Sequence, residues 1–172
     1  MIYHIGLITM TILLISSVIQ AKNPLFQNDP YFGDQWGHHN KGNCVPRFGD
    51  GQLVGIADAD ADLPEAWSLT TGNANHVIAI IDTGVKFDHP ELIGRFWENT
   101  DEISGNGIDD DGNGYVDDRD GWDFVDNDNN PTFSPGTALK DHGTRMAGIV
   151  AANTNNGIGV AGVDWKCYVM IL

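Results

Sequence analysis

The sequence predicts an α/β domain in which helices flank a parallel β-sheet. Residues 77–81 form a continuous apolar run, which is typical of a strand buried on both faces of such a sheet, and the apolar run at 168–172 predicts another buried strand. Residues 143–153 place small and apolar side chains on one face of a helix. The second apolar run reaches the last residue, so we expect a domain truncated after this helix and the strand that follows it.

The first 21 residues are predicted to form a secretory signal peptide. They contain no Lys, Arg, Asp or Glu, and an apolar run over residues 5–19 ends shortly before Ala21. Cleavage after Ala21 leaves residues 22–172 as part of one domain, and we expect a secreted, extracellular protein. The alternative is an uncleaved segment that anchors the chain in a membrane.

The charge of the chain is strongly negative. Its 24 acidic and 9 basic residues give a net charge of −15. Such a surface repels nucleic acids and anionic lipids, so neither is expected as a partner. Eleven of the acids lie between residues 101 and 128, where Arg119 is the only base. This concentration predicts bound cations.

The elements before the first predicted strand are short. Residues 22–51 are rich in Asn, Asp, Gly, Pro and aromatic residues, which indicates an irregular segment held by its rings. The alternation of Ala and Asp over residues 57–62 suits a strand. However, Asp62 as N-cap and Pro64 in the first turn favour a short helix that ends near residues 71–72.

The strand at 77–81 ends at Asp82, in the position where functional side chains of parallel sheets collect. In the turn that follows, His89 is predicted to stabilise the turn. Within the helix at 143–153, Gly148 costs about 1 kcal/mol relative to Ala. Its presence indicates close packing against the sheet at that point.

Asp82 and His142 form the most informative pair in the sequence. A carboxylate at the end of a strand can accept the Nδ1 proton of an imidazole and leave Nε2 free to take a proton from a hydroxyl, as in a Ser-His-Asp triad. None of the serines opens a Gly/Ala-rich helix, as a nucleophilic serine does; they are Ser16, Ser17, Ser68, Ser104 and Ser134. We therefore expect this chain alone to be inactive.

Three blocks resemble motifs of the subtilisin-like serine proteases, the subtilases or peptidase family S8. The aspartate motif is similar to residues 77–85 (VIAIIDTGV), the histidine motif to 141–152 (DHGTRMAGIVAA), and the stretch behind it to 155–163 (NNGIGVAGV). The resemblance covers residues 28–172 and implies a subtilisin-like fold and an endopeptidase that acts on proteins or peptides. It implies that Asp82 is the triad aspartate and His142 the general base. Because the family's serine motif and oxyanion-hole asparagine follow later in the domain, it also implies a fragment.

The acidic segment at 101–130 contains a calcium-loop pattern with Asp in place of the final Glu. Gly114 permits the sharp turn that lets oxygen ligands converge. The candidate ligands are Asp109, Asp111, Asn113, Tyr115 through its carbonyl, Asp117 and Asp120. The alternative is a solvated acidic loop without a metal, and no organic cofactor is indicated.

The resemblance also implies a second calcium site around the loop behind the histidine helix. Its candidate ligands are the side chains of Glu91 and Asn156 and the carbonyls of Thr154, Ile158 and Val160. An Asn-rich helix end without a metal is the alternative.

Two other functions remain open at the level of sequence. Asp82-Thr83-Gly84 also suits the aspartate of a homodimeric aspartic protease, and the loop at 109–120 also suits a non-enzymatic, secreted calcium-binding module. The only cysteines, Cys44 and Cys167, can pair in a secreted protein or stay unpaired.

Overall fold

The computed structural model describes residues 23–42, 44–46, 52–133 and 141–172. The predicted signal peptide therefore lies outside the described residues. Within the described ranges, no helix has the length and apolar character needed to cross a membrane. The elements are, in chain order, η1 (Phe32–Asp34), β1 (Cys44–Pro46), β2 (Gln52–Val54), α1 (Leu63–Leu69), β3 (Val77–Ile80), α2 (His142–Ala151) and β4 (Tyr168–Ile171).

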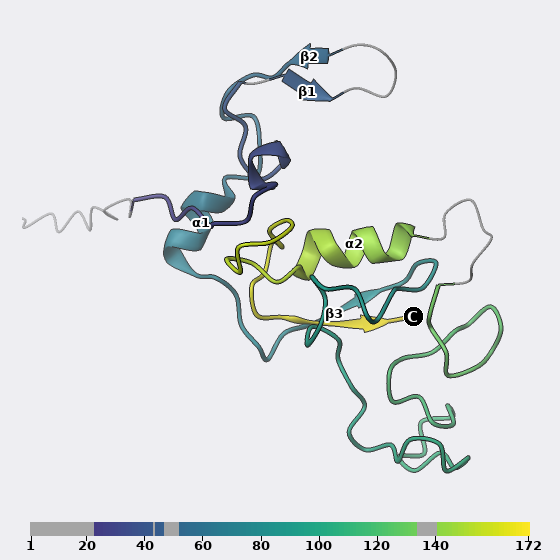
Figure 1. The fold of residues 1–172 in the computed structure, drawn as a ribbon. Helices are drawn as coiled ribbons and strands as arrows, with labels where there is room; N and C mark the ends of the chain where they lie inside the picture. Colours follow the sequence, from purple (N-terminus) through teal and green to yellow (C-terminus); the bar gives the residue numbers. More distant parts are fainter. Residues whose placement is uncertain (1–22, 43, 47–51, 134–140) are drawn as a thin grey trace, which may run out of the picture.

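β3 and β4 form the parallel pair that the sequence predicts. Val77 lies opposite Tyr168 and Ile80 opposite Ile171, and the pairing continues where the N–H of Asp82 donates to the carbonyl of Leu172 at 3.1 Å. α2 lies between the two strands in sequence and packs along one face of the pair (Figure 1). The expected α/β class with a parallel sheet is confirmed.

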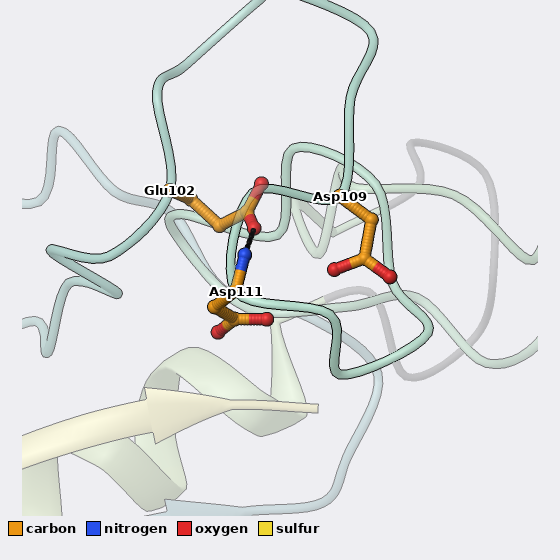
Figure 2. A group of neighbouring side chains, drawn as sticks. All are labelled: Glu102, Asp109 and Asp111. Atoms are coloured by element: carbon orange, nitrogen blue, oxygen red, sulfur yellow. Dashed lines mark hydrogen bonds between the residues drawn. The ribbon is translucent and has the colours of Figure 1, made fainter.

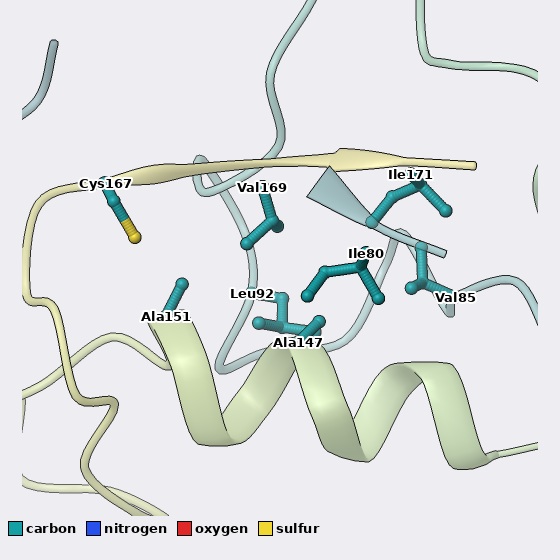
Figure 3. Close-up of a cluster of buried hydrophobic side chains, with 8 residues drawn as sticks. All are labelled: Ile80, Val85, Leu92, Ala147, Ala151, Cys167, Val169 and Ile171. Carbon is teal, nitrogen blue, oxygen red and sulfur yellow. The ribbon is translucent and has the colours of Figure 1, made fainter. Parts of the chain in front are cut away.

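The core lies between α2 and the strand pair (Figure 3). Buried residues of α2 recur every four positions, at Gly143, Ala147 and Ala151, so they form one stripe along the helix. Ala147 and Ala151 belong to the same buried cluster as Val169 and Ile171 of β4. Small side chains on this stripe let the helix axis approach the sheet closely, which brings the start of α2 near the end of β3.

The prediction that β3 is buried on both faces is wrong. Of its residues only Ile80 is buried, whereas Val77 is 43% exposed and Ile81, directly after the strand, is 80% exposed. The physical reason is that α2 covers only the face that carries Ile80. Among the described residues, no named helix or strand other than α2 and β4 contacts β3.

Close packing of a helical glycine occurs at Gly143, whereas the sequence predicted it at Gly148. A Cβ built on Gly143 would lie 2.3 Å from the carbonyl oxygen of Gly84 and 3.2 Å from Cβ of Asp82. At Gly148 the same construction meets no atom within 4 Å. Sequence reasoning missed this because both glycines break the helical pattern equally, and only the packing partner distinguishes them.

The part of the chain before β3 forms its own small cluster, in which Phe32, Leu63 and Trp67 pack with Ala161. The short helix is confirmed as α1, with Pro64 in its first turn. Asp62 stands at the N-cap but makes no capping hydrogen bond through its side chain, because its backbone is left-handed (φ 52°). β1 and β2 pair antiparallel.

Cys167 is a free thiol, fully buried in the core next to α2 (Figure 3). Burial raises the pKa of Cys167 above its usual value, so the thiol is held in its neutral form. The side chain of Cys44 lies outside the described residues. Among the side chains that the structure describes, Cys167 has no disulfide partner.

Candidate active site

The turn after β3 presents Asp82 beside the start of α2. Gly84 has φ 79° in this turn, and a Cβ there would lie 2.7 Å from the backbone nitrogen of Phe133. Val85, directly after the turn, donates its N–H to the carbonyl of Pro131 at 3.1 Å and is completely buried. The turn is thus held against residues 131–133, and the direction of Asp82 is set by backbone contacts.

The imidazole of His142, the first residue of α2, contacts the carboxylate of Asp82. Nδ1 lies 2.8 Å from Oδ1 and 2.7 Å from Oδ2, as the sequence predicts. A carboxylate at Nδ1 requires the proton on that nitrogen, which leaves Nε2 able to accept another. The side chain of Asp82 is 14% exposed and that of His142 is 46% exposed, so the imidazole remains accessible to a reacting group.

The environment of Asp82 favours the ionised carboxylate. Burial raises its pKa, but hydrogen bonds from the backbone and hydroxyl of Thr83 and from His142 outweigh burial and leave the pKa below its ordinary value. The partner of Asp82 is thus an imidazole, whereas an aspartic protease requires a second carboxylate. The geometry supports a relay of Asp and His and gives no support to the aspartic alternative.

His89 takes the structural role that the sequence predicts. Its Nδ1 accepts the N–H of Glu91 at 3.3 Å, and its own N–H donates to the carbonyl of Lys86 at 3.1 Å. Both contacts lie within residues 86–91, which follow that turn.

Three carboxylates converge in the acidic segment (Figure 2). Glu102, Asp109 and Asp111 each place an oxygen within 4.8 Å of the others. Two of these residues were predicted as ligands, whereas Glu102 was missed because it lies ahead of the twelve-residue pattern. Glu102 is only 3% exposed and accepts the backbone N–H groups of Asp110, Asp111 and Asp117 at 2.8, 3.1 and 3.0 Å.

Of the other predicted ligands of this loop, Asn113 and Asp117 donate backbone N–H groups to members of this group. Asn113 donates its N–H to Asp109 and Asp111 at 3.0 and 2.9 Å, and the carboxylate of Asp117 accepts the N–H groups of Asn106 and Gly107. The ring of Tyr115 packs on that of Trp122 with centroids 4.9 Å apart. Asp120 is exposed and does not belong to the group of three carboxylates.

The loop behind α2 surrounds the buried carboxylate of Glu91. Oε1 of Glu91 lies 3.3 Å from the donor Nδ2 of Asn156, and Oε2 lies 3.3 Å from the donor N–H of Val160. Thr154 donates its hydroxyl to the carbonyl of Ala152 at 2.9 Å, and Ile158 donates its N–H to Oδ1 of Asn156 at 2.9 Å. The structure therefore brings Glu91, Asn156 and Val160 together as the resemblance implies.

Sequence reasoning missed two polar residues of the segment before β3, of which Asp29 contacts this loop. The buried carboxylate of Asp29 accepts the N–H groups of Asn155 and Asn156 at 2.8 and 3.1 Å. Gln27, two positions earlier, has a buried amide whose oxygen and nitrogen have no hydrogen-bond partner among the described residues. The polar run at 27–29 was the available sign in the sequence that this irregular segment has a specific role. Local sequence patterns cannot predict its contact with a loop more than 120 residues away.

Comparisons with known proteins find relatives of this chain. The model of the Subtilase family matches residues 73–172. Subtilisin-like protease 1 of Plasmodium berghei (strain Anka) is 38% identical over 141 residues, which are 81% of this chain and 20% of that protein. Thermitase of Thermoactinomyces vulgaris is 33% identical over 143 residues, which are 83% of this chain and 34% of thermitase.

Solved structures show the same fold. The serine protease of Aeromonas sobria, in a crystal structure with a chaperone, matches 86% of this chain and 20% of its own chain with a TM-score of 0.60 at 23% identity. A protease of Pseudoalteromonas arctica matches 87% of this chain and 38% of its own with a TM-score of 0.50 at 28% identity. The chain thus spans between a fifth and two fifths of the length of these four proteins.

Proposed function

Because the chain belongs to the subtilase family, we propose that it supplies the aspartate and the histidine of a secreted serine endopeptidase. The observation that carries this proposal is the contact of His142 Nδ1 with both carboxylate oxygens of Asp82, at 2.8 and 2.7 Å. The motifs that surround the two residues in sequence support it. Secretion is proposed from the predicted signal peptide at residues 1–21, and the substrates are proteins or peptides.

In the proposed mechanism, Nε2 of His142 takes the proton of a serine hydroxyl as the oxygen attacks the carbonyl carbon of a peptide bond. Asp82 keeps the imidazole in the required tautomer and stabilises the imidazolium that forms. His142 then gives the proton to the leaving amine, and water hydrolyses the acyl-enzyme with the same base. The nucleophilic serine and the oxyanion-hole donors come from a part of the subtilase domain that these 172 residues do not span, so the chain alone is inactive.

A fluorophosphonate probe, which labels activated serines, tests this proposal. We expect no label on the 172-residue chain. A chimera in which residues 73–172 replace the matching segment of thermitase should be labelled and should cleave peptides. Its variant with the nucleophilic serine of thermitase changed to Ala is the control. Labelling of the chain by itself would contradict the proposed division of the catalytic groups, and a folded but unlabelled chimera would contradict the proposed role of Asp82 and His142.

We also propose that the acidic segment at 101–130 binds calcium. Three carboxylates within 4.8 Å repel one another, and a hard cation with oxygen ligands relieves that repulsion. Glu102, Asp109 and Asp111 would hold the ion, which would stabilise the segment. Asn113, Tyr115, Asp117 and Asp120 remain proposed as further ligands.

The loop around Glu91 is the second proposed calcium site, with Thr154, Asn156, Ile158 and Val160 as proposed ligands. The buried amide of Gln27, which has no hydrogen-bond partner among the described residues, is chemically suited to such a site because a carboxamide oxygen is a ligand that calcium accepts. This proposal concerns the structure of the protein and includes no catalytic step.

Calorimetry of the 172-residue chain tests the site in the acidic segment. We expect binding of Ca²⁺, and we expect Asp109→Asn to weaken it at least roughly tenfold because one charged ligand is lost. The control is Asp126→Asn, which changes an exposed carboxylate of the same segment and should leave the affinity within about twofold. Equal affinities in the two variants would contradict the assignment of Asp109.

A further inference from the structure

Two threonines beside the carboxylate–imidazole pair form reciprocal hydrogen bonds between residues 83–86, in and directly after the turn that follows β3, and the first turn of α2. The backbone N–H of Gly143, in α2, donates to Oγ1 of Thr83 at 3.2 Å. In the opposite direction, the backbone N–H of Lys86 donates to Oγ1 of Thr144 at 2.9 Å. Each segment therefore supplies one hydroxyl and one amide to the other.

The hydroxyl of Thr83 serves two groups at once. The first N–H groups of a helix have no partner within the helix, and the N-cap residue Asp141 makes no capping hydrogen bond with its side chain. The hydroxyl of Thr83 accepts one of these N–H groups from across the chain, and its proton is directed to the carboxylate of Asp82. A hydroxyl has one donor and two acceptor positions, so both contacts can exist together.

The backbones of the two segments lie in direct contact at this point. A Cβ on Gly143 would lie 2.3 Å from the carbonyl oxygen of Gly84, so no side chain separates them. Asp82 and His142 are sixty residues apart in sequence, and part of the connection between them is the long polar segment. The connecting segment therefore does not keep Asp82 and His142 in contact. The contacts between the turn and the start of α2 must keep the two side chains together.

We propose that Thr83 and Thr144 are positioning residues for the catalytic pair. Their hydroxyls hold the start of α2 against the turn after β3 and so keep the imidazole of His142 within hydrogen-bond distance of Asp82. The consequence for catalysis rests on the proposed function, but the contacts themselves can be measured without any enzymatic activity. The two residues act by different routes, because Thr83 touches Asp82 whereas Thr144 acts through the backbone of Lys86.

Proton NMR of the 172-residue chain tests the proposal through the solvent exchange of the Nδ1 proton of His142. We expect Thr83→Val and Thr144→Val to accelerate this exchange about tenfold, because each removes the acceptor of one hydrogen bond. The Ser variants at the two positions keep the hydroxyl and should stay within about twofold of the unaltered chain. Thr70→Val is the matched control, since Thr70 Oγ1 accepts the N–H of Gly72 at 3.2 Å at the end of α1.

A second readout separates the two routes. In a pH titration of the Asp82 carboxyl carbon, both Val variants should raise the pKa of Asp82 because the contact with His142 weakens, and Thr83→Val should raise it further because the ionised carboxylate also loses the hydroxyl donor of Thr83. Unaltered Nδ1 exchange in both folded Val variants would overturn the proposal, as would Ser variants that behave like the Val variants.

Should a Val variant fail to fold, hydrogen exchange in the unaltered chain decides. Slow exchange of the Gly143 and Lys86 amides supports the proposed contacts, and exchange at the rate of an open chain overturns them. None of these measurements depends on proteolysis. An inactive chimera would therefore refute the proposed function while leaving the result for the two threonines intact.

Discussion

Replacing Asp82 by Asn in the chimera lowers kcat about 10⁴-fold, a loss of the size measured for the triads of other serine proteases. An amide at this position no longer requires the proton on Nδ1 of His142, so Nε2 is no longer reliably free to act as a base. The imidazolium that forms in the transition state also loses its negative partner. The carboxylate oxygens lie 2.8 and 2.7 Å from Nδ1, close enough for both effects.

The matched control for this variant is Asp88→Asn. Asp88 lies six positions further along, its side chain is 82% exposed, and it pairs with Lys86 at the surface. Since exposed ion pairs contribute little, kcat should stay within about twofold. His142→Ala should cost about 10⁶-fold, and the double variant should cost no more, because the two residues act as one unit. Two results would contradict the proposal that Asp82 and His142 act as one unit. One is a double variant whose loss in kcat equals the product of the two single losses, and the other is an Asp82→Asn variant that keeps about a tenth of kcat.

Gly143→Ala should destabilise the 172-residue chain by about 3 kcal/mol in a denaturant titration, because overpacking forces the backbone to move. The added Cβ would lie 2.3 Å from the Gly84 carbonyl oxygen and 3.2 Å from Cβ of Asp82. The oxygen is part of the backbone and cannot rotate away. The start of α2 must therefore move from the turn, and we expect the contact between His142 and Asp82 to lengthen as well.

Gly148→Ala is the control on the same helix and should have the opposite sign. A Cβ at this position meets no atom within 4 Å, so the substitution adds helix propensity without a clash. We expect a gain of up to about 1 kcal/mol. Equal destabilisation in the two variants would show that the contact of α2 with the turn is less close than the structure indicates.

Much of the fold and of the contact between Asp82 and His142 was predictable from the sequence. The apolar runs predicted β3 and β4, and the helical spacing of small residues predicted α2. The motifs around Asp82 and His142 predicted that these two side chains are in contact. These features depend on local patterns, since backbone propensity and side-chain periodicity act over a few neighbouring residues. The calcium-loop pattern also placed Asp109 and Asp111 correctly in one group.

What the sequence determined by itself is therefore the type of each main element and the identity of the two residues that meet at the sheet edge. Only the tertiary structure decided that Glu102 joins the acidic group, that Asp29 meets the loop behind α2, and that Gly143 rather than Gly148 is closely packed. It also decided that one face of β3 is exposed. The physical reason is that these features depend on which distant segments contact each other. Long polar connecting segments do not determine these contacts, so packing and backbone hydrogen bonds do.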